Sequence, residues 1–116
     1  MNAWFRKFAR RERIGNTALR EAVSRAEVGL IDADLGGGVV KQRVARPGAG
    51  RSSGYRTLVF FRAGARAVFA FGFAKSNQDN ISASDERALK GTAALVLGLT
   101  DEEMDHAVGA GKFEEI

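Results

Sequence analysis

Arginine and lysine are the residues of this chain that could do chemistry, and they gather in its middle. Residues 35–78 contain eight cations and no acid, whereas residues 76–116 contain nine acids and three cations. Ordinary surfaces mix both signs of charge, and the planar guanidinium donates two hydrogen bonds at once to a phosphate. The block therefore favours a phosphate-binding surface over a solvated sheet face. Its cations are Lys41, Arg43, Arg46, Arg51, Arg56, Arg62, Arg66 and Lys75.

Most enzyme chemistries are excluded by the residues that are missing. The chain has no cysteine, which removes disulfides, zinc–thiolate sites and thiol nucleophiles. Its one histidine, His106, lies in an acidic segment that favours a solvated surface residue, and no histidine–carboxylate cluster has metal-ligand spacing. The glycines at 36–38 and 48–50 lack the Lys-Ser/Thr of a P-loop. We expect neither a metal nor a cofactor.

Length and composition predict one domain, residues 1–116, with an acidic C-terminal extension at 99–116. The 116 residues are 45% hydrophobic, which suffices for a core, and the net charge is +4 with a pI of about 10.0. The N-terminal segment has no secretory signal, and no apolar run approaches the roughly 18 residues of a membrane span. We expect a cytoplasmic protein with no membrane partner.

Two amphipathic helices are predicted ahead of the basic block. Residues 3–13 place Trp4, Phe5 and Phe8 at helical spacing with cations between them. Asn16 is the expected N-cap of the second helix, which Gly29 ends. The expected buried face of that helix is Leu19, Ala22, Val23, Ala26 and Leu30.

The pattern of the basic block predicts three antiparallel strands. In residues 39–45 the two-residue period puts Lys41 and Arg43 on one face and leaves the other face apolar apart from a glutamine. Residues 55–62 and 66–75 form a predicted hairpin around Gly64. The second hairpin strand is almost wholly apolar, which favours a central strand covered on both faces. Its expected shared face holds Phe69, Phe71, Phe73 and Lys75.

Two further helices follow. Ser82 or Ser84 can cap the first, and Gly98 ends it. Thr100 with Glu103 is a capping box for the second. The acidic residues 99–116 are either a solvated helix or a segment that lies against the basic face and competes with RNA, and residues 112–116 are either a terminal strand or a frayed end. The element order predicts an α+β fold.

The strand ends bring a candidate site together. Lys41 and Arg43 project from one strand, Arg46 and Arg51 flank the glycine loop, Arg56 begins the next strand and Lys75 ends the third. Tyr55 and Phe73 lie near the same ends, where their rings could stack on bases or belong to the core.

The residues from Gly36 to Ser76 resemble the RelE/HigB group of bacterial type II toxin–antitoxin toxins. The likeness rests on the strand K-x-R-V-A, a glycine-rich basic loop ending in G-x-R, and a third strand ending in G-F-x-K, and it extends over roughly residues 4–97. It implies a RelE-like fold: two N-terminal helices packed on a small antiparallel sheet of three to four strands, then C-terminal helices. It also implies ribosome-dependent cleavage of mRNA and neutralisation by a cognate antitoxin, expected to be a helix-turn-helix protein. The toxin is expected to reach operator DNA only through that antitoxin.

The matched positions are Lys41, Arg43, Arg51, Arg56 and Lys75. RNA cleavage without a metal needs a base for the 2′-OH, positive charge at the phosphorane and an acid for the leaving oxygen. We expect Arg43, Arg51 and Arg56 to stabilise that charge and clamp the RNA. Lys75 or Lys41 is the expected base or proton donor, because a crowd of like charges disfavours a charged lysine. The catalytic set is thus Arg43, Arg56 and Lys75, and the RNA-binding set is Lys41, Arg46, Arg51, Tyr55 and Phe73.

One departure and three alternatives stand beside this interpretation. Many members of the group carry a late catalytic tyrosine or histidine, and neither is suitably placed here. The alternatives are a ParE-type toxin that poisons DNA gyrase, a non-catalytic RNA- or ribosome-binding module, and a toxin that keeps the fold and has lost activity.

Overall fold

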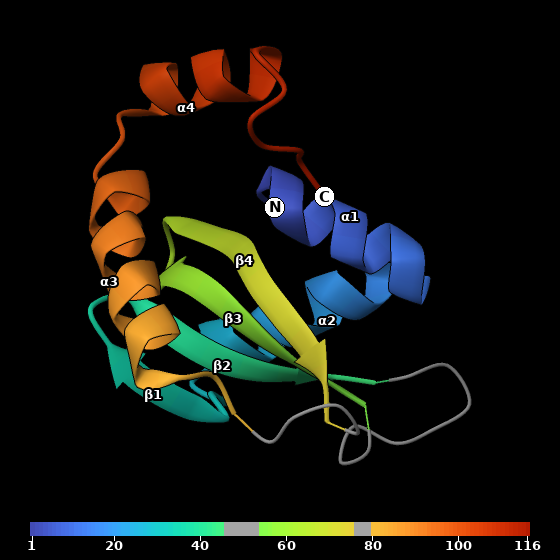
Figure 1. The fold of residues 1–116 in the computed structure, drawn as a ribbon. Helices are drawn as coiled ribbons and strands as arrows, with labels where there is room; N and C mark the ends of the chain where they lie inside the picture. The colour runs from blue at the N-terminus through green and yellow to red at the C-terminus, as the bar shows by residue number, and fades with distance from the viewer. Residues whose placement is uncertain (46–53, 76–79) are drawn as a thin grey trace.

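The computed structural model describes residues 1–45, 54–75 and 80–116 of the chain. Within these residues, one antiparallel sheet with the strand order β1-β2-β3-β4 lies between helices (Figure 1). The strands are β1 (Ala33–Gly36), β2 (Val39–Val44), β3 (Tyr55–Arg62) and β4 (Arg66–Ala74). The helices are α1 (Ala3–Glu12), α2 (Asn16–Glu27), α3 (Ala83–Leu97) and α4 (Asp101–Gly109). The expected α+β order of two N-terminal helices, a small antiparallel sheet and C-terminal helices is confirmed.

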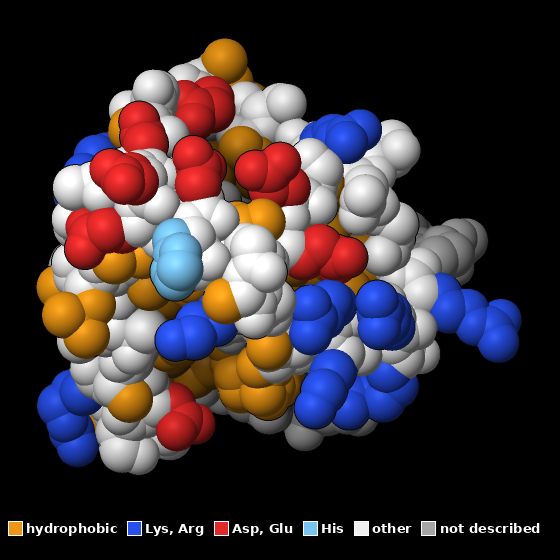
Figure 2. Space-filling model, turned by 90° about the horizontal axis from the view of Figure 1, so that it is seen from above, with side chains coloured by type: hydrophobic (Ala, Val, Ile, Leu, Met, Phe, Trp, Pro, Cys, Tyr) orange, Lys and Arg blue, Asp and Glu red, His pale blue; other side chains and the backbone are white. Residues whose placement is uncertain are grey.

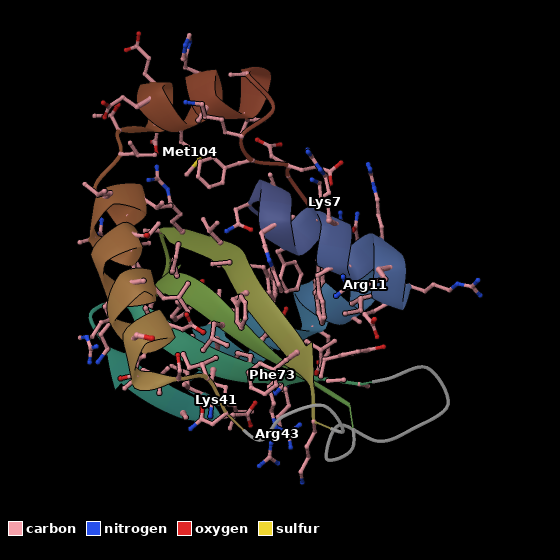
Figure 3. The ribbon with its side chains drawn as sticks, viewed as in Figure 1. Lys7, Arg11, Lys41, Arg43, Phe73 and Met104 are labelled. Carbon is pink, nitrogen blue, oxygen red and sulfur yellow. The ribbon has the colours of Figure 1, made fainter. Side chains whose placement is uncertain are left out.

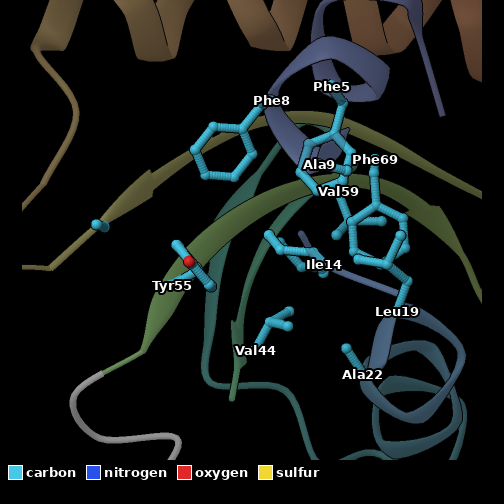
Figure 4. Close-up of a cluster of buried hydrophobic side chains, with 12 residues drawn as sticks. Phe5, Phe8, Ala9, Ile14, Leu19, Ala22, Val44, Tyr55, Val59 and Phe69 are labelled. Atoms are coloured by element: carbon cyan, nitrogen blue, oxygen red, sulfur yellow. The ribbon is translucent and has the colours of Figure 1, made fainter. Parts of the chain in front are cut away.

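One face of the sheet is buried under α1 and α2. Phe5 and Phe8 of α1 and Leu19 of α2 pack with Val59 and Phe69 of the sheet into a cluster of buried side chains (Figure 4). Helix α1 lies close to the sheet because β4 carries Gly72 beneath it. A Cβ at that glycine would stand only 2.8 Å from the Phe8 ring, so a larger residue would push the helix away.

The opposite face is covered by α3 over part of its length. Ala93, Val96 and Leu97 of α3 join a second cluster that contains Val39 of β2 and Phe60 of β3. These two residues form the β2–β3 pair nearest the β3–β4 turn, and we call this end of the sheet the hairpin end. The other end, where β2 finishes, β3 begins and β4 finishes, we call the open end.

Strand β4 corrects two expectations. It is an edge strand, not a central one, and its apolar composition reflects helices on both faces of that edge. Asn2 covers part of the free edge, with its backbone N–H donating to Phe69 O at 3.0 Å and its side chain to Ala70 O at 3.1 Å. The pairing with β3 also slips by one residue between Phe69 and Phe71, a β-bulge that reverses the alternation. Phe69 therefore faces α1, while Phe71 and Phe73 face the α3 side.

Three details of the N-terminal helices differ from the sequence expectation. Helix α2 begins at Asn16 itself, with Gly15 in the N-cap position and no side-chain cap. Leu30 lies beyond the helix and is 61% exposed, because α2 already ends at Glu27. Trp4 is 43% exposed, so only Phe5 and Phe8 of the expected aromatic face are buried.

Helix α4 and the chain end lie at the hairpin end of the sheet. The capping box is present: Glu103 N–H donates to Thr100 Oγ1 at 3.0 Å, and Thr100 N–H donates to Glu103 Oε1 at 2.8 Å. The hydrogen bond from the Thr100 backbone N–H to its carboxylate, followed by the Thr100 side chain, holds the pKa of the Glu103 carboxyl below its usual value. Met104 of α4 shares a pocket of about 550 Å³ with Phe69 of β4, and Phe113 pairs with Asn2. The acidic segment is therefore far from the open end, which overturns the idea that it lies against the basic face.

Candidate functional site

Three cations and one aromatic ring share the α3-side face of the sheet at its open end. The register pairs Arg43 of β2 with Arg56 of β3, and Arg56 with Phe73 of β4, so the three form one row across the sheet. Lys41 lies two residues from Arg43 on the same face, opposite Leu58. Figure 3 shows Lys41, Arg43 and Phe73 together at this end. The strand register thus brings Lys41, Arg43 and Arg56 onto one face of the sheet, as the sequence predicted.

These cations differ in how far they reach solvent. Arg43 is exposed, Lys41 is half-buried and donates from Nζ to Asn80 Oδ1 at 3.1 Å, and Arg56 is only 8% exposed. In the part of the chain that the structure describes, no carboxylate forms an ion pair with Lys41, Arg43 or Lys75. Their positive charge thus remains available to an external anion.

Buried Gln42 fixes strand β2 so that its neighbours face outward. Its side chain is 1% exposed and donates from Nε2 to Ala22 O at 2.9 Å and to Leu30 O at 3.3 Å. Its Oε1 accepts from Asp32 N–H at 2.9 Å. These bonds join β2 to the middle of α2 and to the segment after that helix. Since side chains alternate along a strand, burying Gln42 places Lys41 and Arg43 on the opposite face.

The backbone of Arg43 is held as well. Its N–H donates to Asp32 Oδ2 at 2.7 Å, and its carbonyl accepts from Arg25 Nη2. Arg25 also pairs with the Asp32 carboxylate at 3.3 Å and with Glu21 at 2.7 Å. Asp32 is therefore engaged by Arg25 and by the backbone, and it forms no ion pair with the Arg43 side chain.

Lys75 lies one residue past the end of β4 and is exposed. Its backbone N–H donates to Gly54 O at 3.2 Å, which continues the β3–β4 pairing by one step beyond Tyr55. This places Lys75 at the open end, next to the Arg43–Arg56–Phe73 row. Arg46 and Arg51, the two loop arginines expected in the site, lie outside the described residues.

The two aromatic rings expected to stack on bases are both buried. Tyr55 is 2% exposed, faces α1, meets the Phe8 ring edge-on at 5.7 Å and donates from its hydroxyl to Glu12 O at 3.4 Å. Phe73 shares the cationic face but is 5% exposed. The alternation of β3 turns Tyr55 away from its neighbour Arg56, so Tyr55 is a core residue here and Phe73 forms the floor of the site.

Two cations of the basic block lie elsewhere, at the hairpin end. Arg62 is exposed there, and Arg66 donates from Nη1 to Val96 O at 2.7 Å and to Leu99 O at 2.9 Å, closing the C-terminal end of α3. Arg66 also reaches Asp101 Oδ1 at 3.3 Å. Among the described residues, no group of three His, Asp or Glu side chains is placed to hold a metal ion, and no helix is long and apolar enough to cross a bilayer.

An α+β protein with a basic row on a small sheet is the class that this fold and site define. The family model described as the RelE toxin of the RelE/RelB toxin–antitoxin system matches residues 1–116, and the chain belongs to that family. Neither the comparison with curated proteins nor that with solved structures found a match. Membership makes the chain a toxin of the toxin–antitoxin type, with a cognate antitoxin as its partner. The match extends past the 4–97 expected from the motifs and includes α4.

Proposed function

We propose that this chain is a ribosome-dependent mRNA endonuclease that stops translation, with its site at the open end of the sheet. The observation that carries the proposal is the row formed by Arg43, Arg56 and Phe73, with Lys41 and Lys75 beside it. Membership of the RelE toxin family supports the same class of activity. Messenger RNA on the ribosome is the substrate, and a helix-turn-helix antitoxin in the cytoplasm is the proposed inhibitor.

The chemistry follows from what RNA itself supplies. The 2′-oxygen loses its proton and attacks the adjacent phosphorus, and the bond from phosphorus to the 5′-oxygen breaks as that oxygen takes up a proton. The products are a 2′,3′-cyclic phosphate and a 5′-hydroxyl. The phosphorane gains negative charge on the way, which preorganised guanidinium groups stabilise. Arg43 at the surface and Arg56 beneath it are the groups we assign to that task.

Proton transfer falls to the lysines. Lys75 is exposed at the open end, whereas Lys41 already donates to Asn80 Oδ1 at 3.1 Å. We therefore assign Lys75 as the first candidate for base or proton donor and Lys41 as an RNA contact. A lysine pair without histidine is a modest catalyst, and the ribosome contributes by fixing the mRNA in a geometry suited to in-line attack.

Mapping RNA ends in a cell-free translation reaction tests the proposal. Added protein should produce new 5′-hydroxyl ends within translated mRNA and none when ribosomes are omitted. Lys75→Ala should lower the rate of appearance of these ends at least tenfold. The matched control is Lys112→Ala, which removes an exposed lysine from the hairpin end and should leave the rate unchanged.

Other outcomes would identify the alternatives. Arrested translation with no new RNA ends would indicate a non-catalytic binder of RNA or the ribosome. Intact mRNA together with inhibited gyrase supercoiling would indicate a ParE-type toxin. Normal translation by a folded protein would indicate a copy that has lost activity. Each of these results would contradict the endonuclease.

A further inference from the structure

Helix α1 presents a second basic surface that the proposed site does not use. Residues 3–13 contain five cations and one acid, and the chain's one tryptophan, Trp4, is 43% exposed among them. In Figure 2, lysine and arginine side chains gather over α1, while acidic side chains gather over α4 on the same face of the molecule. An exposed indole within a field of cations is the combination that binds single-stranded nucleic acid, because every base has a face to stack.

A line of aromatic rings connects this surface to the open end of the sheet. Phe73, in the floor of the site, lies 6.4 Å from the Phe71 ring, and Phe71 stacks on Trp4 at 4.5 Å. Trp4 in turn stacks on Phe8 at 5.5 Å. Since Phe71 faces the α3 side and Phe8 lies in the cluster on the α1 side, the line passes around the free edge of β4. The two faces of the molecule are thus joined at Trp4.

Cations follow the line on α1. Lys7 and Arg11 lie three and seven residues after Trp4, and this helical spacing puts all three on one side of the helix. Figure 3 labels Lys7 and Arg11 on α1. Both cations are exposed, and Arg11 lies over the Phe8 ring with Cζ at 5.6 Å from its centroid. Arg11 also pairs with Glu12 at 3.4 Å, but its side chain is 68% exposed, and such a surface pair is worth little.

We propose that Trp4, Lys7 and Arg11 form an auxiliary RNA-binding strip, on which a single RNA strand continues past the open end, around the edge of β4 and along α1. One base stacks on Trp4, and the phosphates on either side of it meet Lys7 and Arg11. The strip extends the proposed function and rests on its RNA-binding part, but it requires no cleavage. It predicts that affinity depends on RNA length, because a short oligonucleotide fills the open end alone.

Trp4 is a built-in reporter of this contact. Titration of the wild-type protein with an oligouridylate of about 12 nucleotides should quench tryptophan fluorescence and shield it from acrylamide, with the midpoint given by fluorescence anisotropy of the labelled RNA. An oligouridylate of about 4 nucleotides, confined to the open end, should leave the signal unchanged. Binding of the long RNA with no change at Trp4 would overturn the strip.

A double variant tests the cations. Lys7→Ala with Arg11→Ala should weaken binding of the long oligonucleotide roughly tenfold and reduce its salt slope by about 1.4, while the short oligonucleotide binds as before. The control removes two charges away from the β4 edge, Arg62→Ala at the β3–β4 turn with Lys90→Ala beside Gly37, and should bind both oligonucleotides as wild type does. Equal losses in the two double variants would show a general charge effect and would contradict the strip.

The failures of the two proposals are distinguishable. If long RNA shields Trp4 but no new mRNA ends form, the result supports the RNA-binding strip and contradicts the endonuclease proposal. If mRNA is cleaved and Trp4 stays accessible to acrylamide throughout, the result supports the endonuclease proposal and contradicts the RNA-binding strip. Protection of Trp4 by a co-purified acidic protein, with none by RNA, would assign the surface to a protein partner and also overturn the proposal.

Discussion

The two ends of one sheet face use arginine in opposite ways. At the hairpin end, Arg66 closes α3 through two backbone carbonyls and also pairs with Asp101. At the open end, Arg43 is exposed, and Asp32 accepts from the Arg43 backbone and from Arg25. Both arginines belong to the same acid-free block of sequence. The difference lies in the neighbours that the fold supplies, so one charge block in a sequence contains both cations that support the fold and cations that stay exposed.

The largest expected effect comes from removing one exposed arginine from each end of the sheet and comparing the two variants. Arg43→Ala should lower mRNA cleavage about 100-fold, because it removes preorganised charge from the phosphorane, and should leave the urea midpoint nearly unchanged. Arg62→Ala at the hairpin end should affect neither. Equal cleavage by the two variants in the cell-free reaction would remove Arg43 from the site.

A second test asks whether the open end depends on its buried support. Gln42→Leu keeps the volume of the side chain but leaves Asp32 N–H, Ala22 O and Leu30 O without their partner. We expect a loss of about 2–3 kcal/mol in the free energy of unfolding, measured by urea at constant m. Gln42→Glu keeps the acceptor for Asp32 N–H but turns a carboxyl oxygen toward the carbonyls of Ala22 and Leu30 in a buried position, so it should recover no stability. A Gln42→Leu protein as stable as wild type would show that this network does not hold β2.

At the hairpin end, the corresponding change is Arg66→Ala. It frees the carbonyls of Val96 and Leu99, which are partly buried, and should cost about 1–2 kcal/mol of stability. Cleavage per folded molecule should stay at the wild-type level. Asp101→Asn removes only the exposed end of the same interaction and should change stability by a few tenths of a kcal/mol. A fall in cleavage without a fall in stability would place Arg66 in the functional set.

The smallest expected effect is a pH dependence in α4, far from either arginine. Glu103 has a lowered pKa in the folded chain, so its capping contribution is fully present above its unfolded value of 4.5 and is lost as pH falls through the folded pKa. The stability difference between wild type and Glu103→Gln should therefore shrink on acidification below that value. An NMR titration of the Glu103 carboxyl that shows an unshifted midpoint would contradict the capping box.

Local signals predicted most of the elements. Period-two alternation located β2 and β3, and the capping residues Ser82 and Thr100 located α3 and α4, because these signals act within a few residues of the chain. The short strand β1 was not predicted separately, since four residues around glycines carry little pattern. The edge position of β4 and its bulge were missed, because both depend on pairing with β3.

The candidate site was predictable in part for the same reason. Alternation alone puts Lys41 and Arg43 on one face, but whether Arg56 joins them or faces the core depends on strand register. Residues that are adjacent in sequence need not share a site. Tyr55 precedes Arg56, but its side chain lies in the hydrophobic cluster on the other face of the sheet. The helical spacing of Trp4, Phe5 and Phe8 does not say which of them is exposed, and the position of α1 at the β4 edge leaves Trp4 at the surface.

By itself, the sequence determined the order of the elements, the acid-free charge block and the motifs shared with the RelE toxin family, since each is encoded within short stretches. The tertiary structure decided which cations meet. The strand register aligns Arg43 with Arg56 across two strands. Asp32 pairs with Arg25 and accepts from the backbone, and Arg66 donates to carbonyls at the end of α3. Those outcomes depend on contacts between residues far apart in the chain, where the strength of a charge is set by its burial and its partners.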